Sequence, residues 1–289
     1  MDRSTPSRSE YMRGARFSRI VIVQSLPPGD SPTGRHLRDA IEATAEALCD
    51  IRVEFIDTQS ASDFWTALDG VRESAERDAD YPVLHLECHG ISDGTGLSLA
   101  DGTPIPWLRL SSPLAKLNQA TRCNLFVTLA ACHGAKLMEV LDTQARSPCW
   151  GLLGPSGEVS PIDLKGSYST FFLELLRTSN ADAALSSLQE SPERRARYFL
   201  FTAEDMFREV FRLYRATCST TVQMTEKVEQ FERILGKHGI PDGAGSWIRP
   251  ELYSAERKIL ERFYERFFFV DHFPENRLRF PDAYSALAP

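Results

Sequence analysis

The chain has 289 residues, of which 42% are hydrophobic and 25% are charged, and its formal net charge at pH 7 is -7. These values are typical of a globular protein with one large domain or two small ones. The negative charge argues against a surface built to bind nucleic acid or a membrane, because both need clustered Lys and Arg. We therefore expect a protein partner or substrate.

Six cysteines are spread through apolar segments without a C-x-x-C pair, which predicts reduced thiols and a cytoplasmic location. Residues 1–18 are polar and basic and lack the apolar segment of a signal peptide, so they are expected to form a flexible tail. No stretch reaches the roughly 18 apolar residues of a membrane span.

From residue 19 the pattern is that of an α/β protein. Short apolar, β-branched runs predict strands, and apolar residues at helical spacing predict the helices between them. The expected strands are RIVIVQSL, IRVEFID, YPVLHLEC, NLFVTLAAC and CWGLLGP. The expected helices cover residues 35–48, 61–78, 107–120, 134–145 and 164–178. Such alternation implies right-handed crossovers and a mainly parallel sheet flanked by helices.

Two local features modify this pattern. Residues 91–106 are rich in Gly and Asp and predict a loop with a β-hairpin, in which Asp101-Gly102 is the tight turn. Pro113 is expected to break the helix over 107–120 near its start.

From about residue 181 onward no strand is expected, because three long stretches carry apolar residues at helical intervals. The predicted domains are therefore 19–190, an α/β domain, and 191–289, an all-helical extension.

The triplet Cys-His-Gly occurs at residues 88–90 and again at residues 132–134, each time at the end of a predicted strand. We call these the first and second triplets. The carboxyl ends of parallel strands share one edge of a sheet, so the two triplets are expected to meet there. Successive side chains of a strand point to opposite faces, so one triplet presents only one reactive group easily. This disfavours a Cys2His2 zinc site, which needs all four groups at one ion, and no metal is predicted.

Two pairs remain, His89 with Cys132 or Cys88 with His133. Cys132 precedes a predicted helix, whose N-terminus favours the thiolate, whereas Cys88 precedes a glycine-rich loop. The prediction is therefore a Cys132 nucleophile with His89 as its general base. The backbone N–H groups of Gly90 and Cys132 are candidate oxyanion donors.

These stretches, VLHLECHG with His89 and Gly90 and FVTLAACHGA with Cys132 and Gly134, resemble the caspase-like cysteine peptidases of clan CD, and more closely their prokaryotic CHAT-domain relatives. The resemblance extends over residues 19–188. It implies a His/Cys dyad that cleaves a protein substrate after one chosen P1 side chain and needs no cofactor. It also implies a regulated effector in anti-phage defence, switched on by a partner or signal.

Asp93, Asp163 and Ala130 also bear on this scheme. Asp93 is a candidate for orienting the imidazole or binding a basic P1 group, or else for capping its own loop. Asp163 is placed near the specificity pocket by analogy, and it is equally suited to cap the helix that begins at residue 164. Ala130 stands where caspases carry Gln and metacaspases carry Asp, so neither acidic nor basic P1 preference carries over.

Two functions from different classes follow. The first is a cysteine endopeptidase. The second is a catalytically silent caspase-like scaffold that binds a regulatory protein through its C-terminal helices, a region that the resemblance does not cover. The aromatic stripe of those helices is expected to belong to a hydrophobic core rather than to a partner groove.

Overall fold

A computed structural model describes residues 17–49, 51–78, 80–218, 221–237, 245–281 and 283. Most of the predicted tail, residues 1–16, lies outside the described residues. The chain forms two compact units. The first runs to Val140 and includes Ser147–Ala203, and the second comprises Leu141–Arg146 and the residues from Glu204 onward. Each unit is described by itself.

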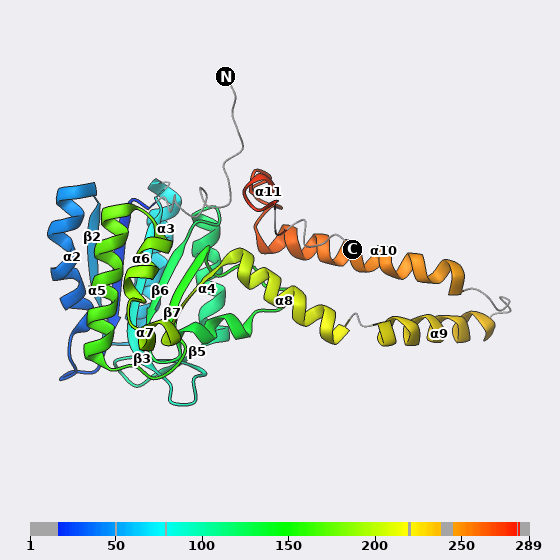
Figure 1. Cartoon of the computed structure of the whole chain (residues 1–289), viewed down its shortest axis with the longest axis horizontal. Coiled ribbons are helices and arrows are strands. Elements are labelled where there is room, and N and C mark those ends of the chain that lie inside the picture. The colour runs from blue at the N-terminus through cyan, green and yellow to red at the C-terminus, as the bar shows by residue number, and fades with distance from the viewer. Residues whose placement is uncertain are drawn as a thin grey trace, which may run out of the picture. The chain divides into compact units, whose positions relative to one another are not determined.

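The first unit is built on one sheet (Figure 1). Its strand order is β2-β1-β3-β6-β7-β8, in which the first five strands are parallel and β8 runs antiparallel to β7. The strands are β1 (Arg19–Ser25), β2 (Arg52–Asp57), β3 (Pro82–Gly90), β6 (Phe126–Ala130), β7 (Gly151–Pro155) and β8 (Tyr198–Thr202). A hairpin of β4 (Gly96–Ser98) and β5 (Pro104–Pro106) pairs with the end of β3. This mostly parallel sheet flanked by helices confirms the predicted α/β class.

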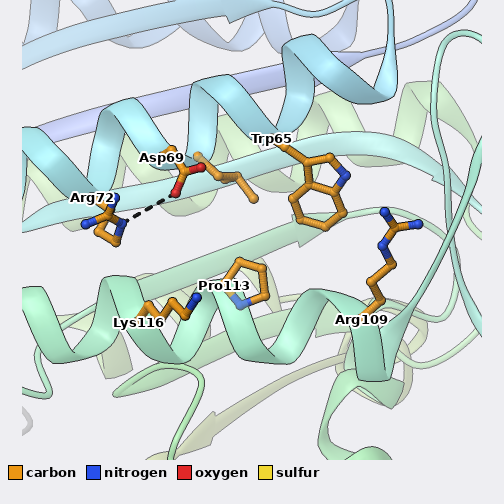
Figure 2. Close-up of a pocket in the computed structure, with 7 residues that line it drawn as sticks. Trp65, Asp69, Arg72, Arg109, Pro113 and Lys116 are labelled. Atoms are coloured by element: carbon orange, nitrogen blue, oxygen red, sulfur yellow. Dashed lines mark hydrogen bonds and ion pairs between the residues drawn. The ribbon is translucent and has the colours of Figure 1, made fainter.

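Helices cover both faces of the sheet. They are α2 (Thr33–Cys49), α3 (Ala61–Asp78), α4 (Trp107–Ala120), α5 (Pro161–Thr178), α6 (Ala181–Leu188) and α7 (Pro192–Arg197). The chain moves outward from β1 to β2 and then back past β1 to β3, so right-handed crossovers place α2 and α3 on opposite faces. Accordingly α2 packs against α5 on one face, and α3 packs against α4 on the other. A pocket lies between α3 and α4 (Figure 2).

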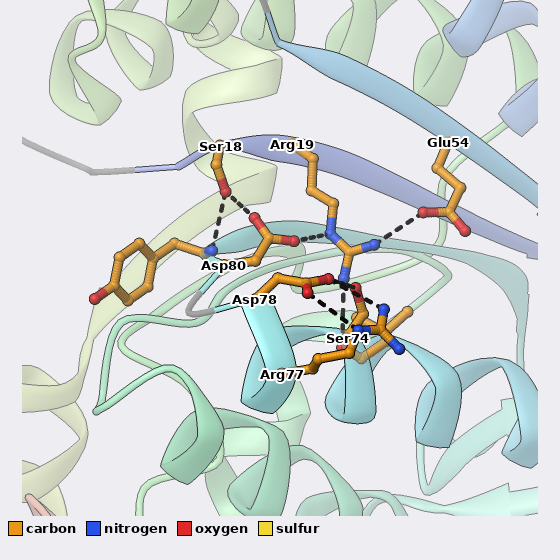
Figure 3. Close-up of polar contacts among 9 residues, drawn as sticks. Ser18, Arg19, Glu54, Ser74, Arg77, Asp78 and Asp80 are labelled. Atoms are coloured by element: carbon orange, nitrogen blue, oxygen red, sulfur yellow. Dashed lines mark hydrogen bonds and ion pairs between the residues drawn. The ribbon is translucent and has the colours of Figure 1, made fainter.

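At the amino ends of the central strands, Arg19 joins three segments (Figure 3). Its side chain is 4% exposed, and it forms ion pairs with Glu54 of β2 at 2.9 Å and with Asp80, which precedes β3. Ser18 contacts the same Asp80 carboxylate and accepts a hydrogen bond from the Tyr81 backbone N–H at 3.0 Å. A buried charge is tolerated when it is paired in this way, so the network fixes the start of β1 between its neighbours.

Two expectations about these elements are wrong. The segment YFLFT forms β8, although no strand was expected beyond residue 181. Its apolar run is short, and short runs fit a strand or a buried helix equally well; pairing with the free edge of β7 decides for the strand. Pro113 lies inside α4 without breaking it. The cost of one missing backbone hydrogen bond is offset by packing of buried Leu110, Leu114 and Leu117.

The second unit is helical, as predicted, with α8 (Ala203–Cys218), α9 (Thr221–Lys237), α10 (Gly245–Phe267) and α11 (Asn276–Arg279). Its core is aromatic: the Phe207 ring stacks on Phe263 at 4.8 Å, and Phe268 stacks on Phe280 at 4.5 Å. Because these rings are buried, the aromatic stripe serves the core. Within the described part of the chain, no helix is both long and apolar enough to cross a membrane.

Candidate active site

The two triplets meet at the carboxyl edge of the sheet. Strands β3 and β6 are neighbours, and their last paired residues are Glu87 and Ala130. Two residues beyond this pair lie His89 and Cys132. Gly90 directly abuts the second triplet, because a β-carbon at residue 90 would stand 2.1 Å from the Cys132 carbonyl oxygen and 2.9 Å from its β-carbon. The structure therefore brings Gly90 and Cys132 into contact, and only glycine fits at position 90.

Cys132 carries the accessible thiol of this edge. Its side chain is partly exposed, whereas Cys88, Cys123 and Cys149 are buried. Its neighbours Ala130 and Ala131 are buried and small. The thiol donates to the Val159 carbonyl oxygen over 3.8 Å, a long contact even for sulfur.

The segment that follows Cys132 differs from the prediction. Instead of an α-helix over 134–145, the chain forms a 3-10 helix, η1 (Gly134–Val140). His133, just before it, has a φ of 61°, which turns the chain sharply out of β6. Such a short helix has a weaker summed dipole than the predicted one, so less stabilisation of a thiolate comes from the backbone.

His133 is held by the loop after β7 rather than by Cys88. Its backbone N–H donates to the Gly157 carbonyl at 3.0 Å, and its ring Nδ1 lies 3.2 Å from the Ser156 carbonyl. Cys88 is 3% exposed, and burial, with the Glu87 charge as the second cause, raises the pKa of its thiol far above the ordinary range. These positions disfavour the pair Cys88 with His133.

His89 is oriented by a residue that the sequence analysis did not single out. Its side chain is 51% exposed, and its Nε2 lies 2.6 Å from the Oδ2 of Asp30. A carboxylate only accepts, so Nε2 carries the proton and the lone pair of the neutral ring is on Nδ1. Asp30 lies in the Pro/Gly-rich loop between β1 and α2, and β1 borders β3. The sequence signal for this contact was that the strand next to β3, β1, ends shortly before Asp30.

A buried polar network supports this edge from below. His85 Nε2 lies 3.0 Å from Glu87, and its Nδ1 lies 2.7 Å from the Thr128 hydroxyl of β6. Glu87 also accepts from the Thr33 hydroxyl at 2.6 Å. His85 is thus a satisfied core histidine, and Thr33 joins the start of α2 to β3 three residues after Asp30.

The Gly90 backbone N–H is oriented away from the hairpin. His89 pairs with Ser98, and the Ile91 N–H donates to the Gly96 carbonyl at 2.9 Å. In an antiparallel ladder, bonded and non-bonded pairs alternate, so Gly90 and Leu97 form the non-bonded pair. The Gly90 N–H is therefore not used by β4, as an oxyanion donor requires.

The two predicted aspartates have local partners. Asp93 accepts from the Thr95 N–H at 2.9 Å and from the Thr95 hydroxyl at 2.6 Å, so it caps its own loop. These hydrogen bonds, with Lys136 as a minor cause, lower the pKa of Asp93. The oriented contact to His89 comes from Asp30 instead.

Asp163 does not cap helix α5. The cap is Ser160, whose hydroxyl accepts from the Asp163 N–H at 3.2 Å, and the helix begins at Pro161 rather than at residue 164. The Asp163 carboxylate is paired with Arg197 at 2.9 Å and with Arg194 at 3.5 Å. Its charge is thus already matched within the first unit.

The thiol and the imidazole are not hydrogen-bonded to each other in the part of the chain that the structure describes. Among those same residues, no group of three or more His, Cys, Asp or Glu side chains is placed to hold a metal ion. Comparison of the sequence with models of protein families gives no match, and comparison with curated proteins gives none either.

Proposed function

We propose that the chain is a cysteine endopeptidase of the caspase-like type, with His89 and Cys132 as its catalytic dyad. The observation that carries the proposal is the contact between Gly90 and Cys132, which joins a half-exposed imidazole and an accessible thiol at one strand edge. A base hydrogen-bonded to an orienting carboxylate is the arrangement that activates such a nucleophile. Catalytic hydrogen bonds are often formed only with substrate bound.

The chemistry follows from the positions of the groups. His89 Nδ1 accepts the Cys132 proton, and the thiolate sulfur attacks the scissile carbonyl carbon. The negative charge that develops on the carbonyl oxygen is stabilised by backbone N–H groups, of which Gly90 supplies one. The imidazolium then protonates the leaving amine as the C–N bond breaks. Water hydrolyses the thioester with His89 again accepting a proton, which regenerates the thiol and releases the carboxylate.

The same proposal includes the substrate class, the location and the cellular role of the chain. The substrate is a protein, the location is cytoplasmic, and the chain acts as a regulated effector in prokaryotic anti-phage defence. Cys88, Cys132 and Cys149 form no disulfide with any described residue, which supports a reducing compartment. The C-terminal helices are the site of a regulatory protein partner, since Leu213 of α8, Phe231 of α9 and Ile259 of α10 remain 45–46% exposed.

Thiol alkylation tests the proposal without knowledge of the substrate. Iodoacetamide is applied at pH 6, where an ordinary thiol with a pKa of about 8.5 is less than about 1% ionised. We expect Cys132 to react at least about tenfold faster than a free cysteine, as located by peptide mapping. Cys132→Ala removes this signal, and Cys88→Ala leaves it intact. A Cys132 rate equal to that of free cysteine, even with candidate activating proteins added, refutes the proposal.

A silent scaffold is the second candidate, and one observation favours it: the Cys132 thiol donates to the Val159 carbonyl rather than to His89. The two functions separate in a phage-protection assay. If the chain is a peptidase, Cys132→Ala loses protection, and the wild type cleaves members of a peptide library. A scaffold keeps protection in Cys132→Ala and loses it when the exposed Phe231 is changed to Asp.

A further inference from the structure

The pocket between α3 and α4 has a volume of about 290 Å³ and takes no part in the chemistry proposed above. It opens on the face of the sheet opposite α2 and α5. Its two walls face each other (Figure 2), and they contribute Trp65, Leu68, Asp69 and Arg72 from α3 and Arg109, Pro113 and Lys116 from α4.

One end of the pocket holds two donors, Trp65 and Arg109, for which no described residue supplies an acceptor. The Arg109 guanidinium carbon lies 5.5 Å from the centre of the Trp65 indole ring. The indole Nε1 is buried and has no hydrogen-bond partner among the residues that the structure describes. Figure 2 shows the indole nitrogen and the guanidinium on the same side of the pocket. A buried donor left unsatisfied costs about 1–3 kcal/mol, so an acceptor placed here gains binding energy from both groups.

The remaining lining separates charge from apolar surface. Arg72 is already paired with Glu76 at 2.9 Å and with Asp69 at 3.4 Å. Arg109 and Lys116, by contrast, form no ion pair with any described residue, and seven residues of helix place them about 10 Å apart on one face. Leu68 and Pro113 supply apolar surface between these two cations.

We propose that this pocket binds a small molecule that carries an oxyanion, a phosphate or a carboxylate, on a compact apolar body. The oxyanion accepts from the Trp65 Nε1–H and the Arg109 guanidinium, because charge-assisted hydrogen bonds with two donors are the strong ones. The apolar body lies against Leu68 and Pro113. A volume of about 290 Å³ accommodates one aromatic ring with its anionic group.

Both walls of the pocket are tied to the segment that follows His89 and Gly90. At the start of α4, the Trp107 indole N–H donates to the Gly94 carbonyl at 2.8 Å, and the Trp107 backbone N–H donates to Thr95 at 3.0 Å. At the start of α3, the Ala61 N–H donates to Asp101 in the hairpin turn at 3.0 Å. A ligand that draws the helices together therefore acts on the loop beside His89. This coupling rests on the proposed function, whereas the binding itself does not.

Binding is tested by NMR on the whole chain with ¹⁵N-labelled tryptophan. The chain has four tryptophans, so four indole resonances are expected, and Trp65→Phe assigns the one of interest. Phenyl phosphate, benzoate and inorganic phosphate are titrated to about 10 mM. We expect phenyl phosphate or benzoate to shift the Trp65 indole resonance downfield, and inorganic phosphate to bind more weakly because it lacks the apolar body. Preference between the first two identifies the anion.

Variants on the exposed surface of α4 decide whether the site is the one described. Arg109→Gln is expected to weaken binding about tenfold or more, and Lys116→Gln less. If none of the three probes moves the Trp65 resonance more than that of Trp150, or if Arg109→Gln binds like the wild type, the site is refuted.

Coupling is measured as the Cys132 alkylation rate with and without saturating probe. We expect a change of at least about threefold in the wild type and none in Arg109→Gln. A bound probe that leaves the rate unchanged refutes the coupling but not the site. If Cys132 never reacts faster than free cysteine, the proposed peptidase function fails, and the NMR titration still decides the pocket.

Discussion

The two Cys-His-Gly triplets have the same sequence and end neighbouring strands, yet they present opposite members of the pair. In the first triplet Cys88 is buried and His89 is half-exposed beside Asp30. In the second triplet Cys132 is accessible, and His133 is fastened to the loop after β7. Identical residues have therefore acquired different roles from their surroundings.

The position of each triplet relative to its strand explains the difference. The first triplet lies inside β3, so its side chains alternate, one into the core and one outward. The second lies beyond the last residue of β6, where the positive φ of His133 turns the chain. The shared motif at two strand ends thus predicted that the triplets lie close together. Whether the Cys or the His of each triplet is accessible depends on where the strand ends relative to the triplet.

Replacing each of the two histidines in turn gives the strongest test of this comparison. His89→Ala is expected to slow alkylation of Cys132 at pH 6 by about 100-fold, because a positioned general base contributes about that much or more. His133→Asn is the matched control, since asparagine tolerates the left-handed conformation at residue 133. It should leave the rate within about twofold of the wild type. Equal effects of the two variants would show that the triplets do not differ in role.

Gly90→Ala tests the contact between the triplets. The added β-carbon would meet the Cys132 backbone, which cannot move aside as a flexible side chain can. We expect the Cys132 alkylation rate to fall at least about tenfold, together with a loss of stability of roughly 1–3 kcal/mol measured by urea unfolding. Gly70→Ala in α3 is the control, because nothing lies within 4 Å of its added β-carbon. It should stabilise the protein by about 0.5–1 kcal/mol.

Asp30 is expected to act as a positioning residue for His89. Asp30→Ala should slow Cys132 alkylation about tenfold, and Asp30→Asn should recover part of the rate because its side-chain oxygen still accepts from Nε2–H. Nitrogen NMR of His89 provides a readout that a purely structural role leaves unchanged: the proton moves from Nε2 toward Nδ1 in Asp30→Ala. An unchanged tautomer in that variant would exclude the positioning role.

Periodicity predicted most of the first unit because its elements are regular. The helix expected over 61–78 is α3 (Ala61–Asp78), and the Asp101-Gly102 hairpin forms between β4 and β5. The meeting of the triplets followed from topology alone, since parallel strands end at one edge.

Other features depend on contacts that no local pattern contains. β8 is a strand only because β7 offers an open edge. Asp30 reaches His89 across 59 positions of sequence. The 3-10 form of η1 was hidden because Leu137 and its neighbours satisfy helical spacing in either helix type.

The smallest expected effect concerns the loop after the first triplet, where the Asp93 carboxylate interacts weakly with Lys136 of the segment after the second triplet. Asp93 follows the first, Lys136 lies in η1 after the second, and a hydrogen bond from the Thr95 hydroxyl is the main reason that the pKa of Asp93 is lowered. A carboxyl with a lower pKa in the folded state stabilises the fold above its unfolded pKa of about 3.9, and this contribution is lost as the pH falls through the folded value. Asp93→Ala should therefore lower Tm by roughly 1–2 °C at pH 7 and by less near pH 2, where the protonated carboxyl keeps only a neutral acceptor for Thr95. Asp93→Asn keeps one acceptor for Thr95 without the charge. If its Tm at pH 7 lies between those of the wild type and Asp93→Ala, the difference between Asp93→Asn and the wild type is due to the charge. A Tm difference between the wild type and Asp93→Ala that grows on acidification would contradict a role of the charge.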